Sequence, residues 1–326
     1  MIGSPSKTLK LRIDRVVAEA IGVLSFDLVD PDGAELPPWE PGAHVEVTVS
    51  EQFRRQYSLC GELQNPYVFR IGVLDAPDGR GGSRHIHEHW RVGDVVEVSQ
   101  PRNHFGLVDQ ASRYTFIAGG IGITPILSMV RSLDARGIPA TVHYGGRCRE
   151  SMAFVSALEN LPLCDLAVIE QDKNGLPDLE KIVRSSPEGS YIYCCGPRGM
   201  IEAVERIVEG HAGNRYHLRT ERFSAGGDAG NDLDPANSQA FTVELRRSGS
   251  TVEVEDNVSI LDAVRVLLPD VVSSCEEGIC GSCEVRVLRG TVDHRDHILT
   301  DEQRSKSETM MICVSRSKSD VLVLDL

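Results

Sequence analysis

The sequence lacks the features that would send a chain into or across a membrane. No run in its 326 residues approaches the roughly 18 consecutive apolar residues that a membrane helix needs. The N-terminal segment MIGSPSKTLKLRIDRV has neither the apolar core of a signal peptide nor a small-residue cleavage site. We therefore expect a cytoplasmic protein without a membrane partner.

Positive charge is also scarce. The 34 Lys and Arg residues are outnumbered by 48 Asp and Glu, which leaves a formal net charge of −14. Binding to a phosphate backbone requires a basic surface, so this balance argues against a nucleic-acid partner. It is compatible with a protein that docks onto a less acidic protein.

A disulfide framework is not indicated either. Nine cysteines occur in a long chain without a signal peptide, whereas disulfide frameworks are typical of short secreted chains. Metal binding or catalysis is the better expectation for these thiols. The chain has no internal repeat, and its length suits two or three domains of roughly 100–200 residues each.

What is present falls first into two blocks with different periodicities. Residues 1–110 contain short alternating runs such as LKLRIDRV and AHVEVTV between turns such as DPDG and PPWEPG, which predicts an antiparallel barrel or sandwich. Residues 111–223 alternate strand-like runs such as YTFIA and YIYCCG with helical patterns such as TPILSMVRSLDARG and MIEAVERIVEG. That pattern predicts a parallel α/β sheet with helices on both faces.

A third block follows a change in composition. Residues 224–240 are rich in Gly, Asp, Asn and Ala and are expected to form a flexible linker. Residues 241–326 open with the hairpin pattern FTVELRRSGSTVEVE, continue with the helical run SILDAVRVLL and a cysteine-rich loop, and end in VLVLDL. We expect a small α+β domain here, and hence a multidomain protein.

Four cysteines of the last block have the spacing of an iron–sulfur site. Cys275, Cys280 and Cys283 form a C-x4-C-x2-C motif, and Cys313 follows 29 residues later. A plant-type [2Fe–2S] cluster uses this arrangement, because four thiolates must converge on two irons from a tight loop and a distant strand. Structural zinc favours two short-spaced pairs, and a Rieske centre needs two histidines in place of two cysteines. The spacing favours the [2Fe–2S] cluster over both.

Small residues punctuate the cysteine loop. Gly278 and Gly281 allow it to bend around a cluster and to direct backbone N–H groups at the sulfurs, and Ser282 leaves room for that approach. The cysteines outside the loop are mostly expected in the core: Cys60, Cys148, Cys164, Cys194 and Cys195.

Two motifs in the first block suit a flavin phosphate. In RRQYSLCG, strand alternation places Arg55 and Tyr57 on one face, where the cation suits a phosphate and the ring suits a planar ligand. The hydroxyl of Ser58 can bond a ring nitrogen. Taken alone, the motif fits an ordinary edge-strand surface better than a flavin site.

The second motif, GRGGSRHIHEHW, supplies an anion site. A turn at Gly81 and Gly82 leads into Ser83, which we predict to be the N-cap of a helix with free N–H groups. The two motifs together fit a flavin phosphate. The segment also holds three histidines, of which only the first and third share a helical face, and we interpret them as a polar face and not as a metal site: His85, His87 and His89.

The second block holds a glycine-rich turn between a strand and a helix. In AGGIGITPILSM, three glycines allow close backbone approach: Gly119, Gly120 and Gly122. The helix N-terminus near Thr124 is expected to receive a pyrophosphate. The motif is not the usual GxGxxG fingerprint, and a plain tight turn is the alternative.

The strand YIYCCG ends at the carboxyl edge of the same sheet. Ligands bind at that edge in open α/β folds. Cys195, followed by Gly196 and Pro197, is therefore placed where a nicotinamide could lie, whereas Cys194 is expected to be a core thiol.

Taken in order, RxYS, GGS, GGIGITP, CCGP and C-x4-C-x2-C…C resemble the phthalate dioxygenase reductase family, which includes vanillate demethylase reductases. The resemblance covers essentially the whole chain. It implies an FMN-binding β-barrel, an NADH-binding α/β domain and a β-grasp, plant-type [2Fe–2S] ferredoxin domain. It also implies a reductase that takes hydride from NADH to FMN and passes single electrons through the cluster to a terminal Rieske-type oxygenase.

The resemblance further implies roles for matching positions. Arg55 and Ser83 would hold the FMN phosphate, Tyr57 would pack on the isoalloxazine, and Ser58 would bond near its reactive N5. Ser58, Thr124 and Cys195 would be the residues nearest the chemistry. Phe223 would shield the flavin, with Glu221 as polar support. The complete set of predicted cofactor-binding residues is Arg55, Gln56, Tyr57, Ser58, Gly72, Val73, Gly81, Gly82, Ser83, Gly120, Gly122, Thr124, Cys195, Gly196, Pro197 and Phe223.

Three alternatives stay open. The first concerns the nucleotide: we expect NADH, but Arg147, which follows a Gly-Gly pair, borders the expected adenosine site and leaves NADPH open. In the same region, Asp172 could bond ribose hydroxyls or lie in a surface turn. An FAD reductase of the same plan is a second possibility, which the GGS phosphate site disfavours. A plain ferredoxin-type electron carrier is the third.

Overall fold

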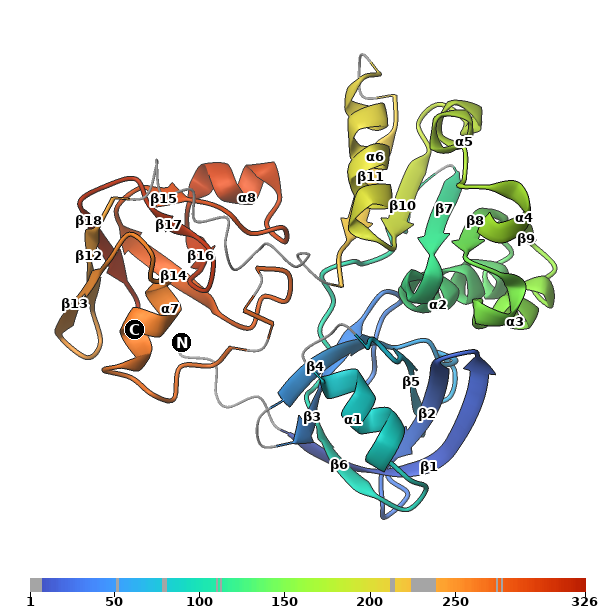
Figure 1. The fold of residues 1–326 in the computed structure, drawn as a ribbon, viewed down its shortest axis with the longest axis horizontal. Helices are drawn as coiled ribbons and strands as arrows, with labels where there is room; N and C mark the ends of the chain where they lie inside the picture. The colour runs from blue at the N-terminus through green and yellow to red at the C-terminus, as the bar shows by residue number, and fades with distance from the viewer. Residues whose placement is uncertain are drawn as a thin grey trace. The chain divides into compact units, whose positions relative to one another are not determined.

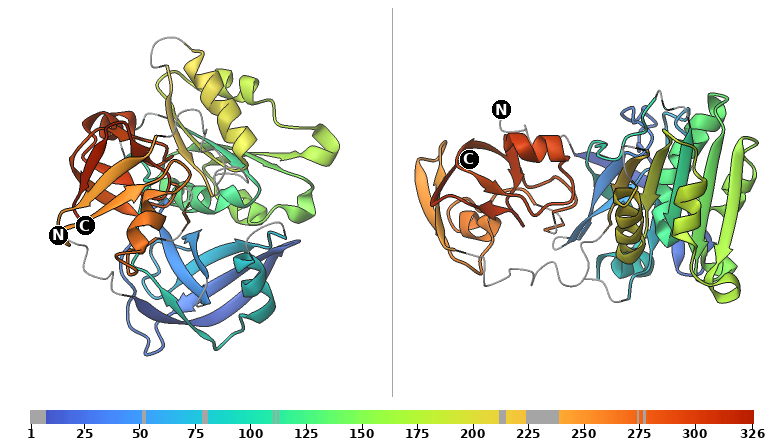
Figure 2. Two further views of the ribbon diagram at one scale, coloured as in Figure 1. Left: turned by 60° about the vertical axis from the view of Figure 1, so that its left-hand side comes forward. Right: turned by 90° about the horizontal axis from the view of Figure 1, so that it is seen from above.

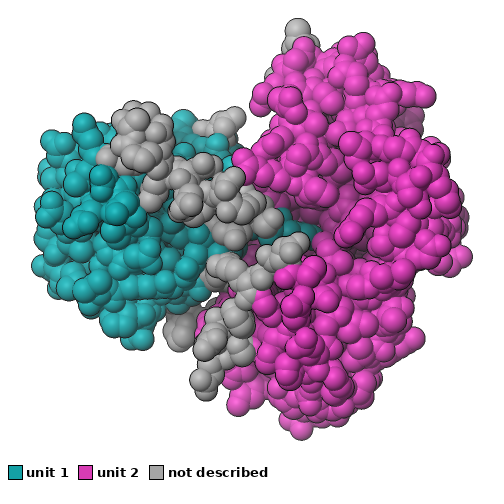
Figure 3. All heavy atoms as spheres, in the orientation of Figure 1, with its two compact units in different colours: residues 1–2, 223–326 teal, residues 3–222 magenta. Residues whose placement is uncertain are grey.

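The computed structural model describes residues 8–50, 53–77, 81–109, 111, 113–211, 215–223, 239–273, 275–276 and 278–326. The chain divides into two compact units, residues 3–222 and residues 223–326 with residues 1–2 (Figures 1 and 3). Apart from residues 239–240, the predicted linker at 224–240 lies outside the described residues.

The first part of residues 3–222 is an antiparallel, barrel-like sheet with the order β4-β3-β6-β1-β2-β5. A bridge between Leu59 and Ile71 joins the β4 end of the sheet to β5. Alternation directs Val45 and Val47 into the buried core, and Ile86 of α1 packs into the same core. The elements are β1 (Leu9–Ala20), β2 (Val23–Val29), β3 (His44–Ser50), β4 (Phe53–Ser58), β5 (Phe69–Leu74), α1 (Gly82–His89) and β6 (Val95–Val98).

The second part is a parallel sheet with the order β11-β10-β7-β8-β9 and helices on both faces (Figures 1 and 2). Along β7, Phe116 packs on the face that α2 covers, and the next residue, Ile117, packs with α5 and α6. The strands are β7 (Tyr114–Gly119), β8 (Ala140–Gly146), β9 (Cys164–Glu170), β10 (Tyr191–Cys195) and β11 (His217–Glu221). The helices are α2 (Ile123–Ala135), α3 (Val155–Glu159), α4 (Gln171–Asn174), α5 (Leu179–Ser185) and α6 (Arg198–Glu209), with the 3-10 turns η1 (Gly120–Gly122) and η2 (Arg149–Ser151).

The barrel and the parallel sheet meet at α2. The N–H of Gly42, before β3, donates to the buried hydroxyl of Ser128 at 3.1 Å. Gly42 has φ 89°, and a Cβ there would lie 2.1 Å from the Phe105 carbonyl oxygen and 2.7 Å from Met129 Cε. Only glycine fits this approach, which fixes the barrel against the helix that opens at the glycine-rich turn.

Residues 239–326 form a mixed sheet with the order β13-β12-β18-β14-β16, in which β12 and β18 are parallel. Ser259 caps α7 by accepting the Asp262 N–H at 3.0 Å, and Thr300 caps α8 in a capping box with Gln303. The elements are β12 (Phe241–Leu245), β13 (Ser250–Val254), α7 (Ile260–Arg265), β14 (Glu284–Arg289), β15 (Val292–Asp293), α8 (Asp301–Lys306), β16 (Thr309–Met311), β17 (Arg316–Ser317) and β18 (Val321–Leu324).

The predicted fold class is confirmed: an antiparallel barrel, a parallel α/β sheet and a small α+β unit follow one another. The strand β11 and the helix α8 were not predicted. In the part of the chain that the structure describes, no helix is both long and apolar enough to cross a bilayer.

Candidate functional site

The predicted phosphate site brings β4 and the start of α1 together. The Arg55 side chain lies against Gly82, because a Cβ on that glycine would be 3.0 Å from Arg55 Nε. Gly81 precedes the helix with φ 89°, a left-handed conformation that glycine adopts without strain. A guanidinium and the free N–H groups of a helix N-terminus thus lie side by side, which is an arrangement suited to phosphate.

The prediction that Ser83 is the N-cap of this helix is wrong. The helix begins at Gly82 and Gly81 is its N-cap, without a side-chain cap. The Ser83 hydroxyl instead accepts the Ala76 N–H at 3.1 Å. The left-handed turn at Gly81 starts the helix two residues earlier than a cap at Ser83 would. Phosphate binding by Ser83 stays a prediction.

The next residues of β4 lie beside a buried histidine. Tyr57 is partly buried against the barrel core, and burial raises its pKa above the ordinary value, so the ring keeps its proton. Ser58 is buried and pairs in register with His44 on β3, as Gln56 pairs with Glu46. Burial, with smaller contributions from His104 and Arg102, lowers the pKa of His44 to about 3. The sequence analysis missed His44, whose only signal is its place in the alternating strand opposite Ser58.

The barrel touches the start of α2 at Gly72. A Cβ on Gly72 would lie 2.9 Å from Thr124 Cγ2 and 3.2 Å from the Phe154 ring. Thr124 is buried, and its hydroxyl donates to the Ile121 carbonyl at 3.0 Å. The structure thus brings together two predicted residues from separate blocks. Phe154 was missed, because its position depends on a left-handed backbone (φ 61°) that its sequence does not announce.

Val73, a predicted cofactor-binding residue, can contact a flavin only through its backbone. Its side chain is fully buried in the barrel core. Its carbonyl oxygen lies 2.9 Å from His87 Nε2. The other two histidines of α1 stack on each other, with ring centroids of His85 and His89 4.3 Å apart, which agrees with their predicted common face.

The glycine-rich turn and the end of β10 are in backbone contact. A Cβ on Gly122 would lie 2.3 Å from the Cys195 carbonyl oxygen and 2.7 Å from the Gly196 nitrogen. A Cβ on Gly119 would lie 2.6 Å from Pro197 Cδ. These approaches require glycine and join the two predicted nucleotide segments at the carboxyl edge of the sheet.

Gly120 differs from these glycines. It has φ 53°, and a Cβ there would meet no atom of the described residues within 4 Å. It therefore serves a left-handed turn that faces open space, and its carbonyl accepts the Tyr144 hydroxyl at 3.1 Å. Space and exposed backbone beside a helix start are the features that a pyrophosphate needs.

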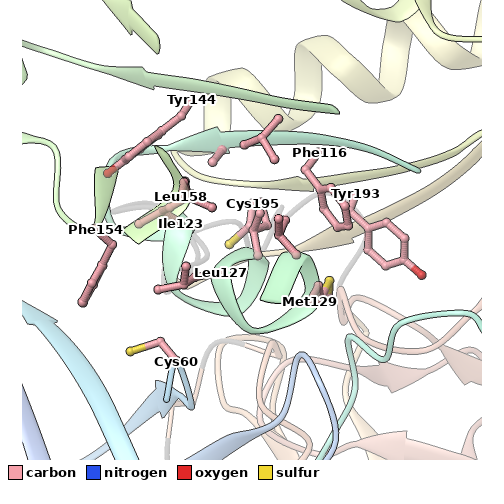
Figure 4. Packing of buried hydrophobic residues seen from close by; sticks show 14 of the residues in the cluster. Cys60, Phe116, Ile123, Leu127, Met129, Tyr144, Phe154, Leu158, Tyr193 and Cys195 are labelled. Carbon is pink, nitrogen blue, oxygen red and sulfur yellow. The ribbon is translucent and has the colours of Figure 1, made fainter. Parts of the chain in front are cut away.

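Cys195 and Glu221 face each other across β10 and β11. They are register partners in the parallel pair. Cys195 is fully buried with Ile123 and Leu127 of α2 (Figure 4), and burial raises the pKa of its thiol well above the ordinary value. Glu221 is half-buried as a residue, yet its Oε2 is buried without a hydrogen-bond partner among the described residues, and burial raises its pKa to about 8.

Two further predicted residues have definite positions. The Asp172 N–H donates to the Arg147 carbonyl at 3.0 Å, so the ends of β8 and β9 bring both candidate adenosine-site residues together. Phe223 is 43% exposed and belongs to the C-terminal unit, so its contact with the barrel stays a prediction.

The four cysteines of the C-terminal unit lie as two pairs. Cys283 Sγ donates to Cys313 Sγ at 3.1 Å, which together with burial raises the pKa of Cys313. A hydrogen bond with Cys275 is the largest cause that lowers the pKa of Cys280, to about 6. The Ser282 N–H also donates to Cys280 Sγ at 3.5 Å.

This pairing fits two irons. Four thiolates on a [2Fe–2S] cluster supply two ligands to each iron. Within the described residues no three His, Cys, Asp or Glu side chains converge as the ligands of one metal ion would. Of the four thiols, Cys280, Cys283 and Cys313 are buried and Cys275 is half-buried. The donor set, its pairing and the N–H aimed at sulfur suit a [2Fe–2S] cluster.

Two family models match the chain. Residues 116–206 match the oxidoreductase NAD-binding domain, and residues 243–318 match the 2Fe-2S iron-sulfur cluster binding domain. The second match spans all four cysteines.

Curated and solved proteins resemble the chain over its whole length. The phenoxybenzoate dioxygenase subunit beta of Ectopseudomonas oleovorans is 41% identical over 98% of this chain and 97% of its own. The solved structure of phthalate dioxygenase reductase, described as a modular structure for electron transfer from pyridine nucleotides to [2Fe-2S], is 37% identical, and the match covers 98% of both chains with a TM-score of 0.70. An intact type IV self-sufficient cytochrome P450 monooxygenase is 39% identical with a TM-score of 0.90, and this chain spans 42% of its length.

Proposed function

The chain belongs to the phthalate dioxygenase reductase family, and from that membership we propose that it is the NADH-dependent reductase component of an oxygenase system. The observation that carries the proposal is the coexistence, in one chain, of an NAD-binding domain and a paired four-cysteine [2Fe–2S] site after a barrel in which Arg55 lies against Gly82 at the start of α1. When bound, NADH supplies a hydride, a flavin accepts it, and the cluster carries electrons one at a time.

The residues of the barrel and sheet bind and orient the two ligands. Arg55 and the start of α1 anchor a phosphate. Ser58 is the register partner of His44 on the neighbouring strand β3, and Tyr57 precedes Ser58 on β4. Gly72 lets Thr124 approach the barrel, and Gly122 lets the turn approach Cys195. The chain thereby directs a flavin ring and a nicotinamide toward each other without a general acid or base.

We propose FMN as the flavin. The cradle at Arg55 and Gly82 suits a terminal phosphate. An FAD reductase of the same plan would need a further site for the adenosine half. Extraction of the flavin and measurement of its mass decides between them: recovery of FMN supports the proposal, and recovery of FAD contradicts it.

We propose domain limits at 1–110, 111–223 and 241–326, with the linker at 224–240, and a cytoplasmic location. We further propose a Rieske-type oxygenase as the partner. The relatives named as subunits of dioxygenase systems support this acceptor, whereas the similarity to a cytochrome P450 monooxygenase favours a haem acceptor. Electron delivery to an isolated Rieske oxygenase, with a P450 haem domain as the parallel acceptor, separates the two.

The reductase itself is tested by steady-state oxidation of NADH with cytochrome c as the acceptor. A reductase sustains turnover and prefers NADH to NADPH. A protein that binds a cluster and oxidises neither nucleotide is a plain electron carrier, and that result contradicts the proposal.

A further inference from the structure

The turn at Gly278, between two cluster ligands, lies on a second segment of the same unit. The His297 N–H donates to the Gly278 carbonyl at 2.9 Å. Gly278 has φ 69°, and a Cβ there would lie 3.2 Å from Asp296 Cα and 3.5 Å from Asp296 Cβ. The cysteine loop is therefore in direct backbone contact with Asp296.

Asp296 places a carboxylate in the interior. The residue is 2% exposed. Its Oδ2 accepts the N–H groups of Leu299 at 2.8 Å and Ile298 at 3.2 Å. Its Oδ1 has no hydrogen-bond partner in the described part of the chain and lies 3.5 Å from His294 Nδ1. A charge at such a site acts more strongly on its neighbours than an exposed one, because little water screens it.

Arg304 of α8 supplies the opposite charge. Its Nη2 donates to the Asp296 carbonyl at 2.6 Å and lies 3.9 Å from Asp296 Oδ2. The Arg304 side chain is only one-third exposed. His294 reaches Ser307 Oγ, at 3.3 Å, on its other side. A carboxylate whose backbone contacts the cysteine loop thus has a guanidinium beside it in the same unit.

We propose that Asp296 and Arg304 set the reduction potential of the [2Fe–2S] cluster. Reduction adds one electron, and hence one negative charge, to the cluster. The carboxylate of Asp296 opposes that charge and lowers the potential, whereas the guanidinium of Arg304 favours it and raises the potential. Asp296 contacts the cysteine loop and Arg304 contacts Asp296, so both are positioning residues that act through the loop and through their field. The inference rests on the proposed cluster site and deepens it.

Redox titration of the full-length holoprotein, followed by the visible spectrum of the cluster, tests this. Asp296→Asn keeps an amide oxygen that can accept the two N–H groups and removes the charge. We expect the reduced-to-oxidised ratio of its cluster, at a fixed applied potential, to rise roughly three- to tenfold, where tenfold is about 59 mV for one electron. Arg304→Gln is expected to move the ratio in the opposite direction.

The controls separate charge from structure. Glu302→Gln removes one negative charge from the same helix at a side chain that is 78% exposed and paired with Lys306, and should leave the ratio unchanged. Arg304→Lys keeps the charge and should restore a ratio close to that of the wild type. Iron content and the flavin potential of each variant confirm that cluster loading and the other unit are intact.

Equal shifts of one sign in Asp296→Asn and Arg304→Gln, or no shift in either variant at full iron content, overturn the inference. If Asp296→Asn fails to load iron, the comparison of the Arg304 variants decides: Arg304→Gln should lower the reduced-to-oxidised ratio, and Arg304→Lys should leave it close to that of the wild type. A wild-type protein without iron would contradict the proposed function instead.

Discussion

The cysteine loop and the barrel–sheet junction are built on opposite principles. In the cysteine site, side chains make the site: four thiols lie in two pairs. Three of them fall within nine positions of the loop, and Cys313 joins them from a later segment. At the junction, the absence of a glycine side chain makes the site: Gly72 allows Thr124 to approach closely, and Gly122 allows the backbone of Cys195 to do so. A local site of reactive groups is visible in sequence spacing. A site formed by close approach depends on which distant segments the fold brings together.

Removing one thiol should have the largest effect, and it should abolish cluster binding without affecting the barrel–sheet junction. Cys280→Ser removes one ligand from the pair formed with Cys275. We therefore expect nearly complete loss of cluster iron and at least tenfold slower reduction of cytochrome c. NADH-dependent reduction of the flavin should continue. Cys164→Ser, a half-buried thiol at the start of β9, is the control and should retain full iron. Retention of the cluster in Cys280→Ser would contradict the ligand assignment.

Adding one methyl group at the glycine-rich turn should impair the use of NADH at the junction and leave cluster binding intact. In Gly122→Ala the new Cβ would lie 2.3 Å from a backbone oxygen of Cys195, so the two nucleotide segments must separate. We expect kcat/KM for NADH to fall on the order of 10- to 100-fold, with cluster iron unchanged.

Gly199→Ala is the matched control for that variant. Gly199 lies within α6, where a Cβ would meet no atom within 4 Å in the part of the chain that the structure describes. This change should leave kcat/KM unaltered and stabilise the protein by about 0.5–1 kcal/mol. Equal losses of activity in both variants would show that the close approach at Gly122 is not the cause.

The barrel side of the junction should tolerate change better. In Gly72→Ala the nearest atoms, Thr124 Cγ2 at 2.9 Å and the Phe154 ring at 3.2 Å, belong to side chains that can shift. We expect a loss of about 1–3 kcal/mol in the free energy of unfolding and weaker retention of flavin. Denaturant unfolding of the holoprotein checks the first, and flavin release on dilution checks the second. An unchanged free energy of unfolding would mean that the contact is loose.

The smallest effect concerns pH. Burial raises the pKa of Glu221 from 4.5 to about 8 in the folded protein. Below pH 4.5 Glu221 is protonated in both the folded and the unfolded state, so the shift costs no stability there; the stability of the fold then falls as the pH rises toward 8. Glu221→Gln should remove that loss, so the variant gains on the order of 1–2 kcal/mol relative to wild type between pH 5 and pH 8. Parallel stability profiles of the two proteins over this range would contradict the assignment.

The sequence predicted the regular parts of both regions for clear reasons. Alternating runs predicted the barrel strands, and the change to a helical period after YTFIA predicted α2. It missed β11, because HLRTE is short and pairs only at the sheet edge. It placed a serine cap at Ser83, because the left-handed turn at Gly81 depends on the backbone. It did not find Phe154 or His44, since their neighbours Gly72 and Ser58 come from other segments.

The most direct test of the account is an anaerobic titration of the holoprotein with NADH, followed by the separate absorbance bands of flavin and cluster. A flavin takes two electrons and a cluster takes one. We predict that both bands bleach and that complete bleaching requires more than one equivalent of NADH. Bleaching of the flavin alone, with a cluster that stays oxidised in excess NADH, would contradict the claim that this chain carries electrons from NADH to [2Fe–2S].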